Sequence, residues 1–150
     1  MEKKTVQKVN VLCISLDTKI TTLMTDTRNL PNELVEKALE LGLEIAGPQI
    51  WVYDGADGNP NTPIELTIAL PIAQTVGEPG KFRFAGFPEM NCISEIHQGP
   101  WAKLGDTYHK LMPAIMQKGL ACTGISREVY HVCDFENQEN CITEIQIEVR

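Results

Sequence analysis

Residues 41–54, LGLEIAGPQIWVYD, and residues 118–131, KGLACTGISREVYH, follow the same pattern at an offset of 77 residues. Each stretch contains a Gly-Leu, a second glycine five residues after the first, and a Val-Tyr pair. The match runs without gaps from residues 34–72 onto residues 111–149, with eight identities in 39 positions. The chain therefore consists of two related halves, and the structure that one half adopts is expected again in the other.

The shared glycines mark the places where each half changes from helix to strand. Gly42 and Gly119 follow apolar residues at helical spacing, where a helix commonly ends on a left-handed residue. Gly47 and Gly124 come just before the next strand. The first half is accordingly expected to form a strand at 9–16, a helix at 31–41 and strands at 49–54 and 64–72.

The second half is expected to follow the same order. Residues 82–98 supply strand material, and a helix opens at Pro100. Pro113 lies inside that helical pattern and predicts a kink or a break. Strands at 126–134 and 141–149 complete the half, the last with Ile145, Ile147 and Val149 inward and Glu144, Gln146 and Glu148 outward.

These patterns predict an α+β fold built from two pseudo-symmetric βαββ repeats, repeat one at about 6–73 and repeat two at about 82–150. Each repeat has only one helix to cover its strands, so neither is expected to be stable alone. The repeats are therefore expected to share one antiparallel sheet in a single domain, 1–150. Because a seam between duplicated halves is a natural place for a cleft, we expect a ligand to bind there.

Charge and cysteine content exclude several classes of protein. The net charge is −7 and the isoelectric point is about 4.9, which disfavours binding to the phosphate backbone of nucleic acid. The five cysteines form no CxxC motif and predict free thiols in a reducing cytoplasm. The apolar run at 9–16 is too short for a membrane span and lacks a cleavage site. We expect a cytoplasmic protein that binds neither nucleic acid nor membrane, and that uses no metal and no cofactor.

One acid lies among the few aromatic residues of the chain. Strand alternation places Glu128 and Tyr130 on one face and His131 on the other. The repeat puts Glu128 at the position of Trp51, and Tyr130 at that of Tyr53. Aromatic rings attract an organic cation through stacking and cation–π contacts, and a carboxylate supplies the counter-charge. The alternative is that the rings belong to the core and that Glu128 is a charge at its rim.

Further residues are candidates for the same cleft. Trp101 and Tyr108 lie on the second helix and complete the group of aromatics. Glu65, Glu95 and Glu144 are weaker candidates, since Glu65 and Glu144 lie opposite the apolar stripes, where a solvated surface is the default; Glu144 could instead line an open groove. Surface or structural roles are the first expectation for His97, His109, His131, Cys122 and Cys133. Asp54 and His131 occupy matching positions of the repeat, and either could reach the cleft if the strand twists.

The second half resembles the GyrI-like family, which includes the effector-binding domains fused to AraC-type and MerR-type transcription regulators. The family pattern has His-x-Gly-Pro before a helix, Gly-Leu at the helix end, Glu-x-Tyr on a strand and Glu-Ile on a closing strand. The first half fits more loosely, through WVYD at 51–54 and the strand at 64–72. The matching residues are His97, Gly99, Pro100, Gly119, Leu120, Glu128, Tyr130, Glu144 and Ile145.

The resemblance implies a cleft between the repeats that binds lipophilic and often cationic compounds on aromatic rings, with a buried glutamate as counter-charge. Glu128 matches that acid, whereas a register shift of three places would put His131 there. No helix-turn-helix segment precedes the domain, so the chain is similar to free-standing members, among them integron-cassette-encoded effector-binding proteins. The expected ligand-binding residues are Glu128, Tyr130, Trp51, Tyr53, Trp101, Tyr108, His131 and Glu144.

Four functions follow from these expectations. The first is a stand-alone, multidrug-type binding module for small hydrophobic cations, acting alone, as a homodimer or with a protein partner. The second, implied by the resemblance, is a hydrolase of reactive cyclopropane-type electrophiles, with Glu128 as general base and Tyr130 or Trp101 orienting the substrate. The third is an interaction protein that modulates gyrase, and the fourth is haem binding. A binding protein is the first expectation among them.

Overall fold

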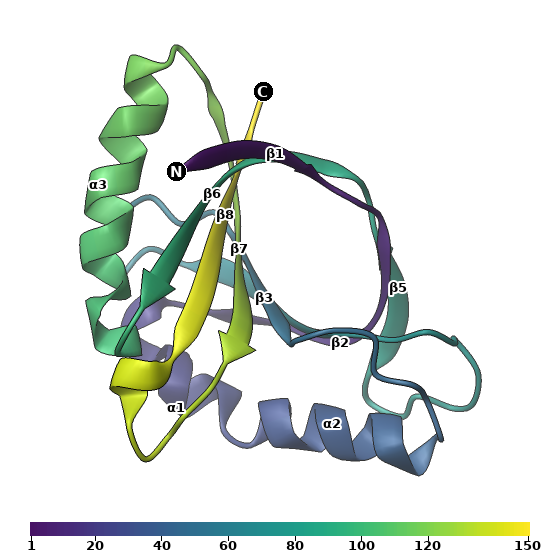
Figure 1. The fold of residues 1–150 in the computed structure, drawn as a ribbon. Helices are drawn as coiled ribbons and strands as arrows, with labels where there is room; N and C mark the ends of the chain where they lie inside the picture. The colour runs from purple at the N-terminus through teal and green to yellow at the C-terminus, as the bar shows by residue number, and fades with distance from the viewer.

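The structure, a computed structural model, describes residues 1–150 and contains one curled sheet of eight strands (Figure 1). The strands are β1 (Glu2–Val6), β2 (Val9–Thr18), β3 (Ile50–Asp54), β4 (Ile64–Pro71), β5 (Arg83–Phe87), β6 (Met90–Gln98), β7 (Cys122–Val132) and β8 (Ile142–Val149). The helices are α1 (Leu23–Thr27), α2 (Leu30–Glu40) and α3 (Leu104–Gln117), with single 3-10 turns η1 (Ile20–Thr22), η2 (Trp101–Lys103) and η3 (Gln138–Asn140). None of the helices is long and apolar enough to cross a membrane.

The order of strands in the sheet is β1-β6-β8-β7-β3-β4-β2-β5, and every neighbouring pair is antiparallel. The first half of the chain supplies β2, α2, β3 and β4, and the second half supplies β6, α3, β7 and β8 in the same sequence of elements. Equivalent strands lie at equal distances from the central pair of β3 and β7. The predicted α+β fold with two βαββ repeats in one antiparallel sheet is confirmed.

The central pair of strands marks the pseudo-two-fold axis. Trp51 of β3 is the cross-strand partner of Glu128 in β7, and these positions are equivalent in the repeat. On either side, Ile50 pairs with Val129 and Val52 with Arg127. Because equivalent positions face each other only where a two-fold axis passes, the axis lies beside the Trp51–Glu128 pair.

The outermost strands are exchanged between the halves. β1, which precedes the first repeat, pairs with β6 of the second half, and β5 pairs with β2 of the first half. The predicted strand material at 82–98 therefore divides into two strands, β5 and β6, that lie in distant parts of the sheet. β1 was not predicted, because its sequence EKKTV is charged and mostly exposed, as is common for an edge strand. α1 was also not predicted, since five residues are too few to show a helical period.

The helix ends follow the glycines of the repeat. Gly42 and Gly119 have φ angles of 68° and 72°, and each N–H donates to a carbonyl of the last helical turn at 3.0 Å. The predicted break at Pro113 does not occur, because α3 runs unbroken from Leu104 to Gln117. Pro113 is exposed, so its ring lies on the solvent side of the helix, where water can bond the carbonyl that the missing N–H leaves free.

Both longer helices lie outside the curl of the sheet, α3 against β6 and α2 against β4 (Figure 1). Leu34 of α2 and Leu111 of α3 are equivalent in the repeat and are 0% and 2% exposed. Each is part of a separate apolar cluster, one for each half of the chain. The two apolar clusters are separate, so no single core spans the seam between the halves.

The face of the sheet inside the curl is partly polar. Glu144 of β8 points away from the helices, as alternation predicts, but it is buried rather than solvated. Its carboxylate pairs with Lys4 of the edge strand β1 at 2.6 Å. It also accepts from Ser94 at 2.8 Å and Gln146 at 2.8 Å, and contacts His131 at 2.9 Å. The predicted solvated surface at Glu144 is wrong, because the side chains of Lys4, Ser94, Gln146 and His131 surround the carboxylate.

These contacts determine how Glu144 titrates. Burial favours the neutral acid, but the hydrogen bonds from Lys4, Gln146, His131 and Ser94 outweigh burial and lower the pKa of Glu144 from 4.5 to about 2. A carboxyl whose pKa is lower in the folded state contributes stability above its unfolded pKa. That stability is lost as the pH falls from 4.5 through about 2.

We therefore predict that Glu144→Gln lowers the free energy of unfolding at pH 7 by roughly 1–3 kcal/mol. At pH 2, close to the pKa of Glu144, about half of the wild-type group is protonated, so the difference between the proteins should shrink. Urea denaturation at both pH values measures it. Glu65→Gln, at an exposed position, is the control and should change stability by less than about 0.5 kcal/mol. An equal loss at both pH values would contradict the assignment.

Candidate functional site

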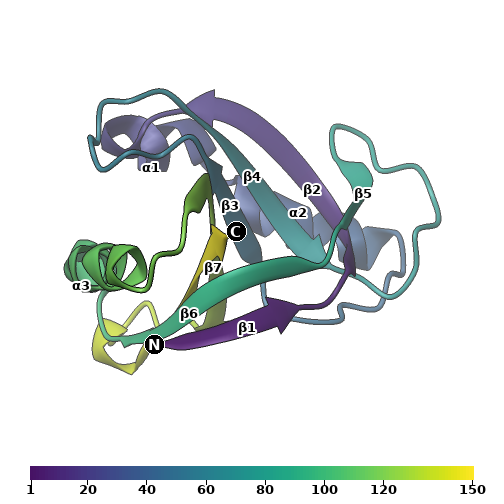
Figure 2. The same ribbon diagram turned by 90° about the horizontal axis from the view of Figure 1, so that it is seen from above.

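The main cavity has a volume of about 1630 Å³ and is lined by both halves of the chain. Its floor includes residues of β3 and β7, and its walls include residues of α1, α2 and α3. Seen from above, α1 and α3 lie to the same side of β3 and β7 (Figure 2). Six of the eight predicted ligand-binding residues line this cavity, namely Trp51, Tyr53, Trp101, Tyr108, Glu128 and Tyr130.

The pairing of β3 with β7 explains why four of these side chains meet. Trp51 and Glu128 are direct cross-strand partners, so they point to the same face. Alternation then places Tyr53 and Tyr130 on that face as well. The Tyr130 N–H donates to the Gln49 carbonyl at 3.1 Å, which extends the pairing beyond the strand end. The two tyrosines are equivalent in the repeat, and their hydroxyls approach within 3.4 Å.

The Glu128 carboxylate accepts hydrogen bonds from three tyrosine hydroxyls. Tyr130 donates to Oε1 at 2.7 Å and Tyr53 donates to the same oxygen at 3.0 Å. Tyr108 of α3 donates to Oε2 at 2.8 Å. The three donors come from β7, β3 and α3, so the carboxylate joins the two halves of the sheet to the helix that covers the second half.

Burial dominates the titration of this group. Glu128 is 6% exposed, and burial raises its pKa above the ordinary 4.5, although the three tyrosine hydrogen bonds work to lower it. Burial and the neighbouring acidic groups raise the pKa of Tyr53, Tyr108 and Tyr130 well above 10. The tyrosines therefore stay neutral donors at neutral pH, and Glu128 is an acid whose charge is sensitive to what lies beside it.

Two tryptophans stand against Tyr130. The Trp51 ring lies 5.6 Å from the Tyr130 ring at an interplanar angle of 82°, and the Trp101 ring lies 6.4 Å away at 85°. Both contacts are edge-to-face, an arrangement that fixes rings in place. Trp51 donates its Nε1 hydrogen to the Gln49 Oε1 at 2.8 Å. The Trp101 Nε1 atom is buried and has no partner within the protein.

The rim of the cavity contains apolar residues that were not identified from the sequence. Phe135 is 79% exposed and its ring lies 5.3 Å from that of Trp101. Met24 on the opposite side is 77% exposed. An exposed Phe or Met has no distinguishing signal in a single sequence, because periodicity reports only the buried face of an element. The lining also includes His109, Cys122 and Cys133 of the residues that the sequence singled out, together with the charged side chains of Arg28 and Asp57.

His131 and Glu144 do not line the cavity. They contact each other at 2.9 Å on the opposite face of the sheet, inside the curl. The alternative register, with His131 in place of Glu128 in the cleft, is therefore not the one that the structure adopts. Alternation along β7 already separates Glu128 from His131, since they differ by three positions.

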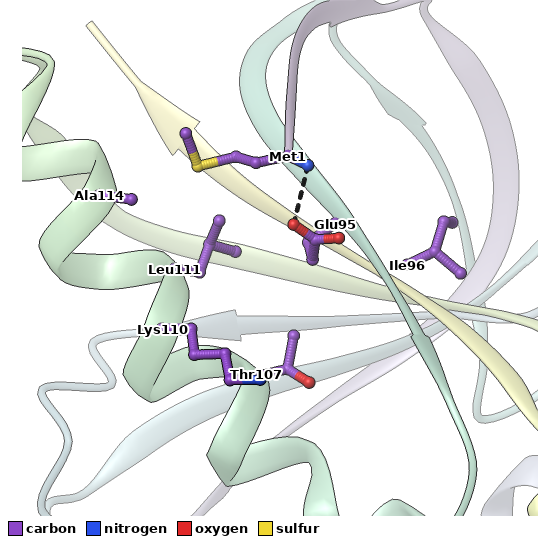
Figure 3. Close-up of a pocket in the computed structure, with 7 residues that line it drawn as sticks. All are labelled: Met1, Glu95, Ile96, Thr107, Lys110, Leu111 and Ala114. Carbon is purple, nitrogen blue, oxygen red and sulfur yellow. Dashed lines mark ion pairs between the residues drawn. The ribbon is translucent and has the colours of Figure 1, made fainter.

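The other acids and His97 have local roles. Glu65 and Asp54 are exposed. Glu95 pairs with the amino group of Met1 at 2.9 Å, beside a smaller pocket of about 410 Å³ between β6 and α3 (Figure 3). His97 lies at the start of the turn before α3, where Nε2 is 3.0 Å from the Pro100 carbonyl and must donate to it. No three His, Cys, Asp or Glu side chains come together in an arrangement that could hold a metal ion.

We predict that Tyr108→Phe raises the pKa of Glu128. The change removes the only donor to Oε2 and leaves the apolar surroundings in place, so the ionised form loses stabilisation. Titration of the Glu128 side-chain carboxyl carbon by NMR measures the shift. Met112→Leu, at another cavity position of α3 without a polar contact to Glu128, is the matched control. An unchanged or lower pKa in Tyr108→Phe would show that this hydroxyl does not support the charge.

Comparison with known proteins identifies relatives of the same fold. The EcmrR C-terminal domain superimposes with a TM-score of 0.83 and 17% identity, covering 99% of this chain and 96% of that one. In the EcmrR–DNA complex, this chain spans 56% of the EcmrR chain. The structure of SAV2435 bound to tetraphenylphosphonium gives a TM-score of 0.66 and 12% identity. The match covers 100% of this chain and 94% of SAV2435.

A hydrolase encoded by lin2189 from Listeria innocua gives a TM-score of 0.64 and 15% identity. The match covers 99% of this chain and 91% of the hydrolase. A search of curated proteins by sequence finds no match. The chain matches the family described as GyrI-like small molecule binding domain over residues 2–150. The resemblance noted in the sequence is thus confirmed, and the chain belongs to the GyrI-like family of small-molecule-binding domains.

Proposed function

We propose that the chain binds lipophilic organic cations in the main cavity, with Glu128 as the counter-charge and the aromatic rings as walls. The observation that carries this proposal is a buried carboxylate without a protein cation. Glu128 is 6% exposed, and none of the ion pairs in the chain includes it. A buried charge without a counter-ion is costly, and the direct partners of this carboxylate are three neutral hydroxyls. A bound cation would offset that cost, and the part that exceeds the cation's own desolvation would contribute to affinity.

The shape of the cavity supports a bulky ligand. Its volume of about 1630 Å³ exceeds the roughly 300–1,000 Å³ of common drug sites, so it has room for several aromatic groups. Most of the accessible lining is apolar, and Glu128 with its three tyrosine partners supplies one buried polar cluster within it. That SAV2435 is described bound to tetraphenylphosphonium supports a ligand of the same chemical class.

The part of EcmrR that this chain matches is about half of that protein in its DNA complex. The net charge of −7 makes direct DNA binding by these 150 residues unfavourable. We infer that the domain acts as a stand-alone capture module for small molecules, and that its five free thiols suit a reducing cytoplasm.

Hydrolysis of an electrophile is the second candidate, since a cavity carboxylate beside tyrosines can act as a general base on water. The three tyrosine hydrogen bonds weigh against it. They occupy three of the roughly four lone-pair positions of the Glu128 carboxylate and leave one to accept a proton from water. We therefore place binding before catalysis.

We predict that Glu128→Gln weakens the binding of tetraphenylphosphonium by about tenfold, the loss expected for removing one desolvated counter-charge. The affinity for triphenylmethanol, which is neutral and similar in shape, should change by less than about twofold in the same variant. Isothermal calorimetry with both ligands measures the difference. Glu65→Gln removes one charge from the exposed surface and should leave both affinities unchanged. Equal losses for both ligands in Glu128→Gln would mean that the carboxylate shapes the cavity without acting as a counter-charge.

We also predict that the wild-type protein binds tetraphenylphosphonium more tightly as the pH rises through the pKa of Glu128. This pKa lies above 4.5 in the free protein, so the counter-charge is lost at acidic pH. The ligand is a permanent cation and does not titrate, and Glu128→Gln should show no such dependence. Fluorescent-dye displacement between pH 5 and 8 tests this, and a parallel pH dependence in the variant would assign it to another group.

A turnover assay separates the two candidate functions. With a cyclopropane-type electrophile in large excess over protein, we expect no product that has gained the mass of water beyond the uncatalysed rate. Mass spectrometry of the small molecules over time measures it. Multiple turnovers that disappear in Glu128→Gln would establish the hydrolase function instead.

A further inference from the structure

We propose that Cys133 and Cys141 are a redox-active pair, and that a disulfide between them closes the loop that carries Phe135 at the mouth of the cavity. Residues 133–141 connect β7 to β8. In the structure both cysteines are free thiols. The bond itself is inferred from strand register and contacts, whereas its effect on ligands depends on the function proposed above.

Strand register places the two cysteines opposite each other. Val132 and Ile142 form the last cross-strand pair of β7 and β8, so Cys133 and Cys141 are the next facing positions. Facing residues of antiparallel strands have Cα atoms about 4.5–5.5 Å apart. Disulfides span Cα separations of about 4.4–6.8 Å. The backbone therefore needs little movement to bring the sulfurs together.

The Cys141 sulfur already lies beside the backbone that follows Cys133. The Asp134 N–H donates to Cys141 Sγ at 3.3 Å, and Cys141 Sγ lies 3.6 Å from the Asp134 carbonyl oxygen. Since two covalent bonds join the Asp134 nitrogen to the Cys133 Cα, that Cα is within about 6 Å of Cys141 Sγ. Although Cys133 is accessible, partial desolvation of its sulfur, followed by the nearby Cys141 thiol, raises the pKa of Cys133. Two independent observations thus put the thiols within reach of each other.

The loop between the cysteines is ordered by its own hydrogen bonds. Asp134 Oδ1 accepts from the backbone N–H groups of Glu136 and Asn137 at 3.1 and 2.9 Å. Asn140 donates its side-chain amide to Asp134 Oδ2 at 3.0 Å. These contacts hold Phe135 against Trp101 at the cavity rim. A disulfide at the base of the loop would restrict this position further.

Exposure assigns the roles of the two thiols. Cys133 is exposed and is the thiol that an external reagent meets first, whereas Cys141 is 0% exposed. The oxidant is a low-molecular-weight disulfide. The Cys133 thiolate attacks one of its sulfurs and expels the other as a thiol, which takes up a proton. The Cys141 thiolate then attacks the Cys133 sulfur of the mixed disulfide and releases the second thiol. In sum, two protein thiols lose two hydrogens and one external disulfide becomes two thiols.

The first test asks whether this bond forms. The folded protein is equilibrated with oxidised and reduced glutathione, free thiols are alkylated, and peptides are mapped by mass spectrometry. We expect Cys133 and Cys141 to be joined in a monomer, with the other three cysteines alkylated after unfolding. The bond should persist in Cys122→Ser, another cavity thiol, and vanish in Cys133→Ser. A different pairing, a bond between two molecules, or a lasting glutathione adduct on Cys133 would overturn the proposal.

The second test asks what the bond does. Closing the nine-residue loop of 133–141 should raise the melting temperature by roughly 5 °C, and dithiothreitol should reverse the change. Dissociation of tetraphenylphosphonium, followed by stopped flow with a competing dye, should slow at least about threefold in the oxidised protein. Cys141→Ser should show neither effect. An unchanged dissociation rate beside a confirmed disulfide would reject the gating role. Absence of tetraphenylphosphonium binding in both redox states would contradict the proposed function and leave the result of the peptide map intact.

Discussion

The antiparallel pairing of β3 with β7 brings Trp51 and Glu128 face to face, two positions that the repeat makes equivalent. A two-fold axis beside this pair forces each equivalent residue on one strand to reappear on the other at the same distance from the axis. Tyr53 and Tyr130 are such residues, and this explains why their hydroxyls meet at a single carboxylate oxygen. The carboxylate itself breaks the symmetry. The two equivalent positions beside the axis hold a Trp in one half and a Glu in the other, so the halves have diverged there. The site is thus a product of duplication followed by a single asymmetric position.

The sheet buries two glutamates on its two faces, and their surroundings shift the pKa values in opposite directions. Glu144, inside the curl, has Lys4 as a partner and a pKa of about 2. Glu128, on the helix side, has only neutral donors, and burial raises its pKa. The first arrangement is complete within the protein and is expected to stabilise the fold, since it ties the edge strand β1 to β8. The second lacks a positive charge, and that incompleteness is what makes Glu128 suited to a cationic ligand.

The parts of this structure that the sequence predicts are those that repeat or alternate. The glycines at 42 and 119 predict both helix ends, and the alternation of Glu128, Tyr130 and His131 predicts which face each occupies. Burial of a side chain by residues that are distant in the sequence cannot be predicted in this way. Glu144 has the alternation typical of a solvated face, and the contacts that bury it include Lys4 of β1, a strand without an apolar pattern. Tyr108 could be placed on a helix but not opposite Glu128, because its equivalent in the first half is Pro31, which offers no hydroxyl for comparison.

Divergence between the halves also shapes the mouth of the cavity. In the second half, η2 continues directly into α3, whereas in the first half α1 and α2 are separated at Arg28, whose φ angle is 48°. A non-glycine residue at positive φ costs about 1–3 kcal/mol, a strain that must be offset by neighbouring contacts. The offset of 77 residues relates Trp101 on one rim to Met24 on the other. One rim is therefore a ring fixed by Tyr130 and Phe135, and the other is a flexible, exposed methionine. A rigid aromatic wall facing an adaptable thioether suits ligands that share a charge and an apolar character but differ in shape.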